Sequence, residues 1–368
     1  MFVIQFKNEQ GYIVVSATKN YHPILVEVDS GIYDYDIISQ SGISYLYESY
    51  KEEIRKSRNL PKESVLKERM GWAKYEIAQR DDYPFSKSSD PLIDLIESSI
   101  AEWEAEGYNY YFLGQCPNYL PENIYNRFIS IAQNTANENY DYMENSVILE
   151  LRRDSETNIG PLLTTSWNQH TFEVENELVY TGCATVAIGQ ILAYHQFPTD
   201  INWQLILSKN PFYRRSFLEE LAYDLSADFG EDGTGVSIDN VKSYLTQINY
   251  SYSEINHNTS TVLTSLNSNY PVYMRGSDSE YPWANGHAWV CDGYRSNSSS
   301  FRYILKVISP AEPLSYETVD SYNTSTGNSR FHMNLGWGGS QNGYYHDSNY
   351  TSDLDYKHNR KDLVNIHH

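Results

Sequence analysis

The order of secondary-structure patterns in residues 160–368 is the feature that most constrains the fold. Helical patterns come first, over residues 183–194, 213–227 and 237–247, and Ser237 is the expected N-cap of the third helix. Strand patterns follow over residues 271–275, 287–294, 301–308 and 331–335. Helices followed by strands predict an α+β fold with segregated layers, and not a doubly wound α/β sheet.

The first half of the chain predicts a separate α+β domain. Residues 2–6, 11–16 and 24–28 have strand composition, residues 43–79 have a helical pattern that Pro61 divides in two, and residues 91–106 fit a further helix. Residues 107–145 lack clear periodicity, and residues 146–152 fit a strand. Residues 152–158 are entirely polar, which predicts an exposed linker that a protease could cut. With 368 residues available, we expect two domains, at 1–158 and 159–368.

Charge and composition exclude several classes of partner. The formal net charge is −21, which argues against nucleic acid or an anionic membrane surface as a partner. No stretch has the roughly 20 apolar residues of a membrane span. Three cysteines cannot form a disulfide framework, and at least one thiol is left over. The first residues form no signal peptide, so the sequence alone leaves open a cytoplasmic protein or one whose signal peptide has been removed.

Cys183 is the first candidate for chemistry. It follows Gly182 and opens an apolar helix, where the helix dipole and unsatisfied N–H groups would lower the thiol pKa and could bind an oxyanion. A buried structural cysteine would fit the same local sequence.

Three other positions could complete such a site. His287 opens an apolar strand after Gly286, and an imidazole beside a thiol can form the thiolate–imidazolium pair that attacks amides. Gln169 could donate to an oxyanion, and Asn334, with Trp337 in the glycine-rich turn that follows, could orient and shield the imidazole. Taken alone, each fits an ordinary loop or turn residue as well. The cysteines and histidines show no metal-binding spacing, so no metal or other cofactor is expected.

The order Gln, Cys, His, Asn is that of papain-like cysteine peptidases, and four blocks in this order resemble the streptopain family. They are residues 160–169 (GPLLTTSWNQ), 182–198 (GCATVAIGQILAYHQFP), 286–294 (GHAWVCDGY) and 331–339 (FHMNLGWGG). Residues 2–34 are similar to the start of that family's inhibitory propeptide, whereas residues 35–159 match less clearly.

The resemblance implies a cysteine endopeptidase made as a zymogen, in which an α+β propeptide domain precedes a papain-like catalytic domain. The helical layer would carry the nucleophile Cys183 against an antiparallel sheet that carries His287. Gln169 and the Cys183 N–H would form the oxyanion hole, and Asn334 and Trp337 would orient and shield the imidazole. The implied partners are protein or peptide substrates and the chain's own propeptide as inhibitor. The implied location is secreted or at a bacterial cell surface.

Two departures from the family keep alternatives open. Leu335 stands where the family usually has a tryptophan, and residues 170–181 are acidic, with Glu173, Glu175 and Glu177. Leu335 favours a catalytically inactive homologue that acts as a binding or inhibitor-like protein. A Cys-His acyltransferase or transglutaminase-type enzyme would share the chain order, but such enzymes usually orient the imidazole with an aspartate on the next strand, and no Asp stands in the equivalent loop after residue 330.

Overall fold

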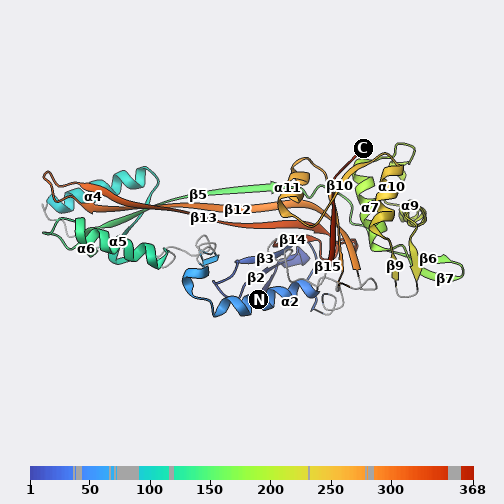
Figure 1. The fold of residues 1–368 in the computed structure, drawn as a ribbon, viewed down its shortest axis with the longest axis horizontal. Helices are drawn as coiled ribbons and strands as arrows, with labels where there is room; N and C mark the ends of the chain where they lie inside the picture. The colour runs from blue at the N-terminus through green and yellow to red at the C-terminus, as the bar shows by residue number, and fades with distance from the viewer. Residues whose placement is uncertain are drawn as a thin grey trace.

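The computed structural model is an elongated molecule built around one long antiparallel sheet (Figure 1). The structure describes residues 1–35, 38, 44–65, 68–69, 72, 91–115, 120–230, 233–277, 280, 286–346 and 358–368. The strands of the sheet are β1 (Phe2–Gln5), β2 (Tyr12–Val15), β3 (Ile24–Val28), β4 (Asn109–Phe112), β5 (Val147–Ile159), β10 (Ser251–Ile255), β11 (Val272–Ser277), β12 (Gly286–Ile308), β13 (Tyr316–Asn334), β14 (Gly343–His346) and β15 (His358–His367). Nine of them follow the order β1-β2-β3-β14-β13-β12-β11-β15-β10, while β5 pairs with β12 and β4 pairs with β5.

The N-terminal strands continue the sheet of the second half, because β3 pairs with β14. A short 3-10 helix, η1 (Lys7–Glu9), connects β1 and β2, and α2 (Ser44–Arg58) packs on these strands. The first of the two helices predicted over residues 43–79 is thus confirmed as α2. Beyond Pro61 the structure has the 3-10 helix η2 (Lys62–Val65), and most of residues 66–79 lie outside the described residues. This core joins the two halves of the sequence; its members include Tyr12, Leu25, Val26, Tyr47 and Tyr50 from the first and Trp289, Phe331, Met333, Leu335 and Val364 from the second.

A distal lobe forms at the end of the long sheet where β12 ends and β13 begins (Figure 1). It consists of α4 (Pro91–Ala105), β4, η4 (Leu113–Gln115), α5 (Glu122–Thr135), α6 (Tyr142–Asn145) and the first part of β5, packed on the far ends of β12 and β13. The prediction of α4 is confirmed, whereas α5 was missed although Ile124, Phe128 and Ala132 recur at helical spacing and are buried. Their cluster also includes Phe301, Tyr303 and Leu305 from β12, so the lobe combines residues of both predicted domains.

The expected linker at residues 152–158 is wrong, because this segment is the second part of β5. It pairs with β12 in unbroken register from Arg152 opposite Phe301 to Ile159 opposite Tyr294. Its side chains are largely exposed, as predicted, but its backbone groups are hydrogen-bonded in the ladder. A strand with solvent on both faces needs no apolar residues, so its composition looks like that of a loop. The predicted boundary at residue 158 falls within β5 and stays a prediction.

The second half has the predicted α+β architecture, with a helical layer on an antiparallel sheet. Its helices are α7 (Cys183–His195), α8 (Trp203–Ile206), α9 (Pro211–Asp224), α10 (Ile238–Gln247) and α11 (Thr259–Asn267). Two short hairpins lie outside the main sheet, β6 (Thr171–Val174) with β7 (Glu177–Tyr180) and β8 (Asp228–Gly230) with β9 (Gly233–Gly235). Ser237 caps α10 as predicted, whereas the strands predicted over 287–294 and 301–308 are one strand, β12. In the described part of the chain, no helix is long and apolar enough to cross a membrane.

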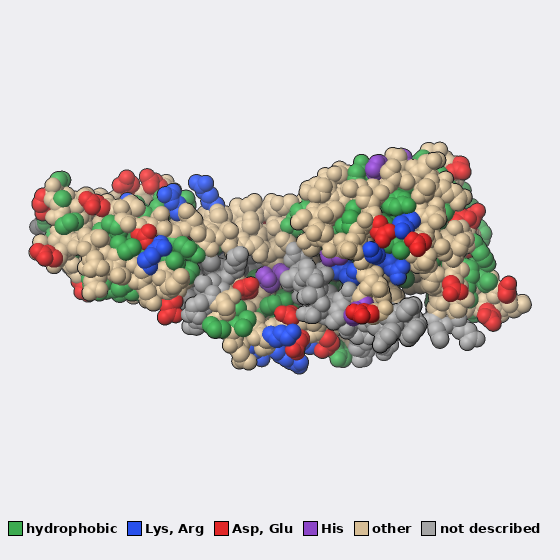
Figure 2. Space-filling view, viewed as in Figure 1, with side chains coloured by type: hydrophobic (Ala, Val, Ile, Leu, Met, Phe, Trp, Pro, Cys, Tyr) green, Lys and Arg blue, Asp and Glu red, His purple; other side chains and the backbone are tan. Residues whose placement is uncertain are grey.

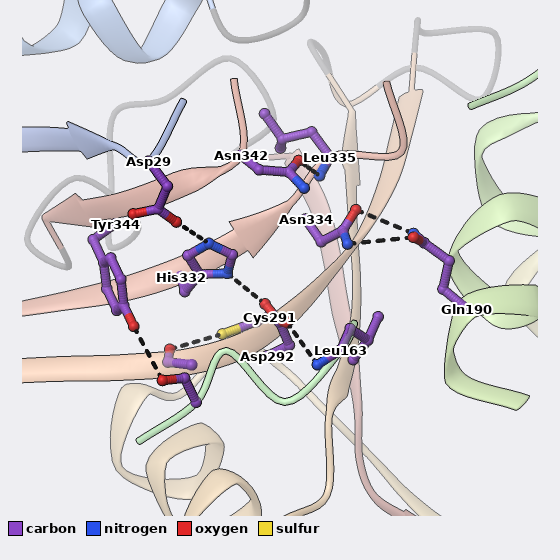
Figure 3. Close-up of polar contacts among 12 residues, drawn as sticks. Asp29, Leu163, Gln190, Cys291, Asp292, His332, Asn334, Leu335, Asn342 and Tyr344 are labelled. Atoms are coloured by element: carbon purple, nitrogen blue, oxygen red, sulfur yellow. Dashed lines mark hydrogen bonds and ion pairs between the residues drawn. The ribbon is translucent and has the colours of Figure 1, made fainter. Parts of the chain in front are cut away.

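Charged side chains join β3 to the sheet of the second half. Glu27 accepts hydrogen bonds from Arg295 at 2.7 Å and from Arg330 at 3.1 Å. His332 lies between two carboxylates, with Nδ1 2.6 Å from Asp292 and Nε2 3.0 Å from Asp29 (Figure 3). Burial alone would lower the pKa of His332, but the hydrogen bonds to Asp29 and Asp292 outweigh it and raise the pKa to about 9.

This raised pKa makes stability depend on pH. Because the folded pKa of about 9 exceeds the ordinary 6.5, the stabilisation is fully present below pH 6.5 and is lost as pH rises through 9. We expect the free energy of unfolding in urea to fall by roughly 2 kcal/mol more between pH 7 and pH 9.5 in the wild type than in His332→Asn. Equal pH dependence in both proteins would contradict this assignment.

Candidate active site

Cys183 is the first residue of α7, and Gly182 sets its position. Gly182 has φ +88°, a backbone conformation that other residues rarely adopt, and a Cβ there would lie 3.1 Å from Cγ2 of Thr234. Ten residues of α7 are buried, so the helix is fixed against the rest of the domain. The thiol therefore starts a rigid helix beside the β8–β9 hairpin.

His287 is the second residue of β12, and aromatic and backbone groups hold its ring. Nε2 lies 3.2 Å from the Leu335 carbonyl oxygen, which can only accept, so Nε2 carries the proton. The ring stacks on Trp337 at 5.1 Å between centroids and 30° between planes, and on Trp289 at 5.8 Å and 17°. This arrangement leaves Nδ1 as the nitrogen that can take up a proton.

One pocket of about 390 Å³ brings the thiol and the imidazole together with Gln169. The wall of the pocket also includes residues of β7 and β9 and the residues that precede Gln169 and His287. The lining residues are Asn168, Gln169, Tyr180, Cys183, Gly233, Thr234, Gly286 and His287. All of these lie between residues 168 and 287, so no described residue of the N-terminal half lines the pocket. Thr234 Oγ1 also donates to the Tyr180 carbonyl, which ties β9 to β7 at the rim.

The expected low pKa of the Cys183 thiol is not what the structure shows. Burial around the sulfur raises the pKa, although the residue as a whole keeps intermediate exposure, and burial outweighs the backbone N–H groups of Ala288, Ala184 and Cys183 that lower it. Burial also lowers the pKa of His287 to about 4, against a smaller opposing effect of the Leu335 carbonyl. Both shifts disfavour a thiolate–imidazolium pair in this conformation.

Asn334 holds a neighbouring loop and does not bond the imidazole. Its Nδ2 donates to the Thr165 carbonyl at 2.7 Å, and its Oδ1 accepts from the Gly336 N–H at 3.3 Å. Its Oδ1 also accepts from Gln190 Nε2 at 3.1 Å, a contact that Figure 3 shows. The predicted orienting role of Asn334 is thus corrected: the acceptor at His287 Nε2 is the carbonyl of the next residue, Leu335. A backbone acceptor at this point could not be identified from side-chain types.

Gln190 is the residue of the site that sequence reasoning missed. It lies on α7 two turns after Cys183 and is completely buried. Its Oε1 accepts from the Trp167 N–H at 3.0 Å and its Nε2 donates to Asn334, so it fixes the segment that leads to Gln169. The sequence contains one signal for it: Gln190 is a polar amide in an otherwise apolar helix that carries no charged residue before His195, which is typical of a buried side chain with hydrogen-bond partners.

The loop after Asn334 is attached to the segment that carries Gln169. Asn168 and Trp337 form an isolated antiparallel bridge, and the Gly338 N–H donates to the Trp167 carbonyl at 3.0 Å. The Leu335 N–H donates to Asn342 at 3.0 Å, while the Leu335 side chain packs in the core shared with the N-terminal strands (Figure 3). Although Leu335 stands where the family usually has a tryptophan, the imidazole of His287 still stacks against two indoles, those of Trp289 and Trp337.

The remaining thiols and possible metal ligands do not extend the site. Cys183 and Cys291 are both free thiols; Cys291 is buried in β12, as expected of a core residue, and Cys116 lies outside the described residues. Within the described ranges, no group of three or more His, Cys, Asp or Glu side chains is placed to hold a metal ion. The absence of a cofactor stays a prediction.

Comparisons with known proteins point to one family. The family model described as the Peptidase C10 family matches residues 163–222 and 215–345. The thiol protease/hemagglutinin PrtT of Porphyromonas gingivalis is 22% identical over 254 residues, which are 53% of this chain and 25% of that protein. The chain thus spans about a quarter of the length of this curated relative.

Two solved structures from Prevotella intermedia were also found. Active wild-type interpain A cysteine protease has 17% identity and a TM-score of 0.38, and the match covers 56% of this chain and 94% of that one. A prointerpain A fragment has 14% identity and a TM-score of 0.45, over 99% of this chain and 97% of that one. The family assignment rests on the match to the family model.

Proposed function

This chain belongs to the Peptidase C10 family, which is the streptopain family of cysteine peptidases, and from that premise we propose that it is an endopeptidase that acts through Cys183 and His287. The observation that carries the proposal is the shared pocket, in which the thiol at the start of α7 and the imidazole of β12 meet beside Gln169. Its substrates would be proteins or peptides, and the proposed reaction would need no cofactor.

The proposed reaction follows from the atoms of the pocket. The Cys183 sulfur attacks the scissile carbonyl carbon, and its proton passes to Nδ1 of His287, since Nε2 already donates to the Leu335 carbonyl. The Cys183 N–H and the Gln169 side-chain amide stabilise the oxyanion. His287 then gives its proton to the leaving amine, and water hydrolyses the thioester to release the second product and restore the thiol. Trp337 and Trp289 shield the ring from water.

We further propose that the uncleaved chain is a latent form and that its N-terminal half inhibits it. In the uncleaved chain, burial raises the pKa of the Cys183 thiol and lowers that of His287, which disfavours the thiolate, the more reactive form of the nucleophile. The N-terminal strands do not line the pocket, but Tyr12 and Leu25 pack in one core with Trp289 and Leu335, both of which contact His287. Inhibition would therefore act through the packing behind the imidazole. Secretion or display at a bacterial cell surface stays a prediction from the family resemblance.

Covalent labelling tests the proposed nucleophile. We expect a thiol-directed peptidyl epoxide to modify the purified chain once, at Cys183, after limited proteolysis that switches on casein hydrolysis, and to abolish that hydrolysis. Peptide mapping by mass spectrometry locates the label. Cys291→Ala should still be labelled because Cys291 is buried in β12, whereas Cys183→Ala should be neither labelled nor active.

An inactive homologue predicts a different outcome. Such a protein would hydrolyse no casein before or after proteolysis, and the epoxide would not react faster with Cys183 than with a free thiol in solution. Casein hydrolysis retained by Cys183→Ala would overturn the proposed nucleophile directly.

A further inference from the structure

The β6–β7 hairpin, which lies between Gln169 and Cys183 in the sequence, has one face fixed in the protein. Phe172 packs edge-on against Tyr223 and Phe229, with centroids 6.0 and 5.6 Å apart, and its cross-strand partner Val179 is 3% exposed. Because side chains alternate along a strand, the neighbours of Phe172 and Val179 along the two strands project from the opposite face of the hairpin.

The other face continues the wall of the catalytic pocket. Tyr180 lines that pocket together with Cys183, and Leu178, two residues earlier on β7, lies on the same face. Tyr180 is 50% exposed and Leu178 is 74% exposed, the largest value among the large apolar side chains in the described ranges. An apolar surface left open beside a reactive thiol is a feature of binding sites.

Acidic side chains accompany these apolar groups. Glu173 is exposed and is the cross-strand partner of Leu178, so both lie on this face. Glu175 lies at the turn, whereas Glu177 is the cross-strand partner of Val174 and lies on the packed face, so Glu173 is the acidic side chain of the open face. Figure 2 shows Asp and Glu side chains at the end of the molecule where Figure 1 places the hairpin. The charge therefore favours a cationic ligand next to an apolar one.

We propose that Leu178, Tyr180 and Glu173 form a substrate subsite that binds an apolar side chain of an extended peptide adjacent to a lysine or arginine. The inference rests on the proposed peptidase function, because it assigns this surface to the same pocket. The occupant is a peptide, since Tyr180 lines the pocket that holds the reacting groups, and Leu178 and Glu173 lie on the same face of the hairpin as Tyr180. The apolar side chain would cover Leu178 and the ring of Tyr180, and the cation would lie against Glu173.

Peptide substrates test the apolar part. A fluorogenic library, scanned with leucine or serine at each position beside a fixed lysine, identifies the position with the strongest leucine preference. At that position we expect the wild type to favour leucine at least about tenfold in kcat/KM, and Leu178→Ser to reduce the preference to about twofold or less, mainly through KM. Leu205→Ser is the matched control, because Leu205 is an exposed leucine on α8 that does not line this pocket, and it should keep the wild-type preference.

Removal of the charge from the ligand or from the protein tests the acidic part. Glu173→Gln should reduce the preference for lysine over norleucine several-fold at low salt, whereas Glu97→Gln, on α4 of the distal lobe, should not. The subsite is refuted if Leu178→Ser lowers kcat/KM equally for the leucine and serine peptides, or if Glu173→Gln leaves the lysine preference intact. Epoxide labelling of Cys183 separates the two proposals: failure of labelling refutes the peptidase function, whereas intact labelling with unchanged peptide preferences refutes only the subsite.

Discussion

Replacing His287 with alanine is expected to lower kcat/KM of the proteolytically activated chain by on the order of 10³-fold, because the substitution removes the only group in the described pocket that can carry the thiol proton to the leaving amine. The loss should fall on kcat, since the imidazole acts in the chemical step and contributes little to binding of the remainder of the peptide. Initial rates on a fluorogenic peptide, with active sites counted by epoxide titration of the wild type, measure the effect.

His195→Ala is the matched control for this substitution. His195 lies at the end of α7 opposite Cys183, where its Nδ1 is 3.1 Å from the Tyr250 hydroxyl, and it does not line the pocket. We expect its kcat/KM to stay within a few-fold of wild type. A His287→Ala enzyme that retained a tenth or more of wild-type kcat would show that another group transfers the proton.

Replacing Gln190 with leucine is expected to lower the free energy of unfolding by about 3 kcal/mol, because the Trp167 N–H and the Asn334 amide would lose buried partners. The same change should lower kcat/KM by about tenfold or more, since the segment that Gln190 holds leads to Gln169 and forms a bridge to Trp337. Urea unfolding and peptide hydrolysis measure the two effects on one preparation.

Gln133→Leu provides the matched comparison, because Gln133 is exposed on α5 of the distal lobe. It should change the free energy of unfolding by no more than about 0.5 kcal/mol and leave kcat/KM unchanged. If Gln190→Leu proved as stable as the wild type, the hydrogen bonds of Gln190 would contribute nothing net, and its positioning role would fail.

The positions of Cys183, His287 and Gln169 could be predicted because each lies in a local pattern whose order along the chain is informative. The partner of Asn334 could not be, because an amide can bond many acceptors and Gln190 lies 144 residues away in the sequence. The ionisation of Cys183 was predicted in the wrong direction for a related reason. The helix start is visible in the sequence, but the burial that outweighs it depends on distant elements.

The fold shows the same division between local and distant information. α2, α4, α7 and α10 were found from apolar spacing and caps, which are properties of a few neighbouring residues. The strand character of residues 152–158 was invisible, because it depends on pairing with β12 about 140 residues later, and the partner segment is polar too. Binary patterning identifies strands only where one face is buried.

The shared cores of the distal lobe determine how this chain must unfold. Ile124, Phe128 and Ile148 are packed with Phe301 and Leu305, and Trp103 and Val147 with Ile304, so residues before 160 and after 300 stabilise one another. The lobe is therefore a discontinuous cooperative unit, and a break in the backbone between its two contributions would leave the fragments associated. A segment that is continuous in the sequence is therefore not the unit that unfolds cooperatively. In denaturation, we expect residues before 160 and residues after 300 in this lobe to unfold together.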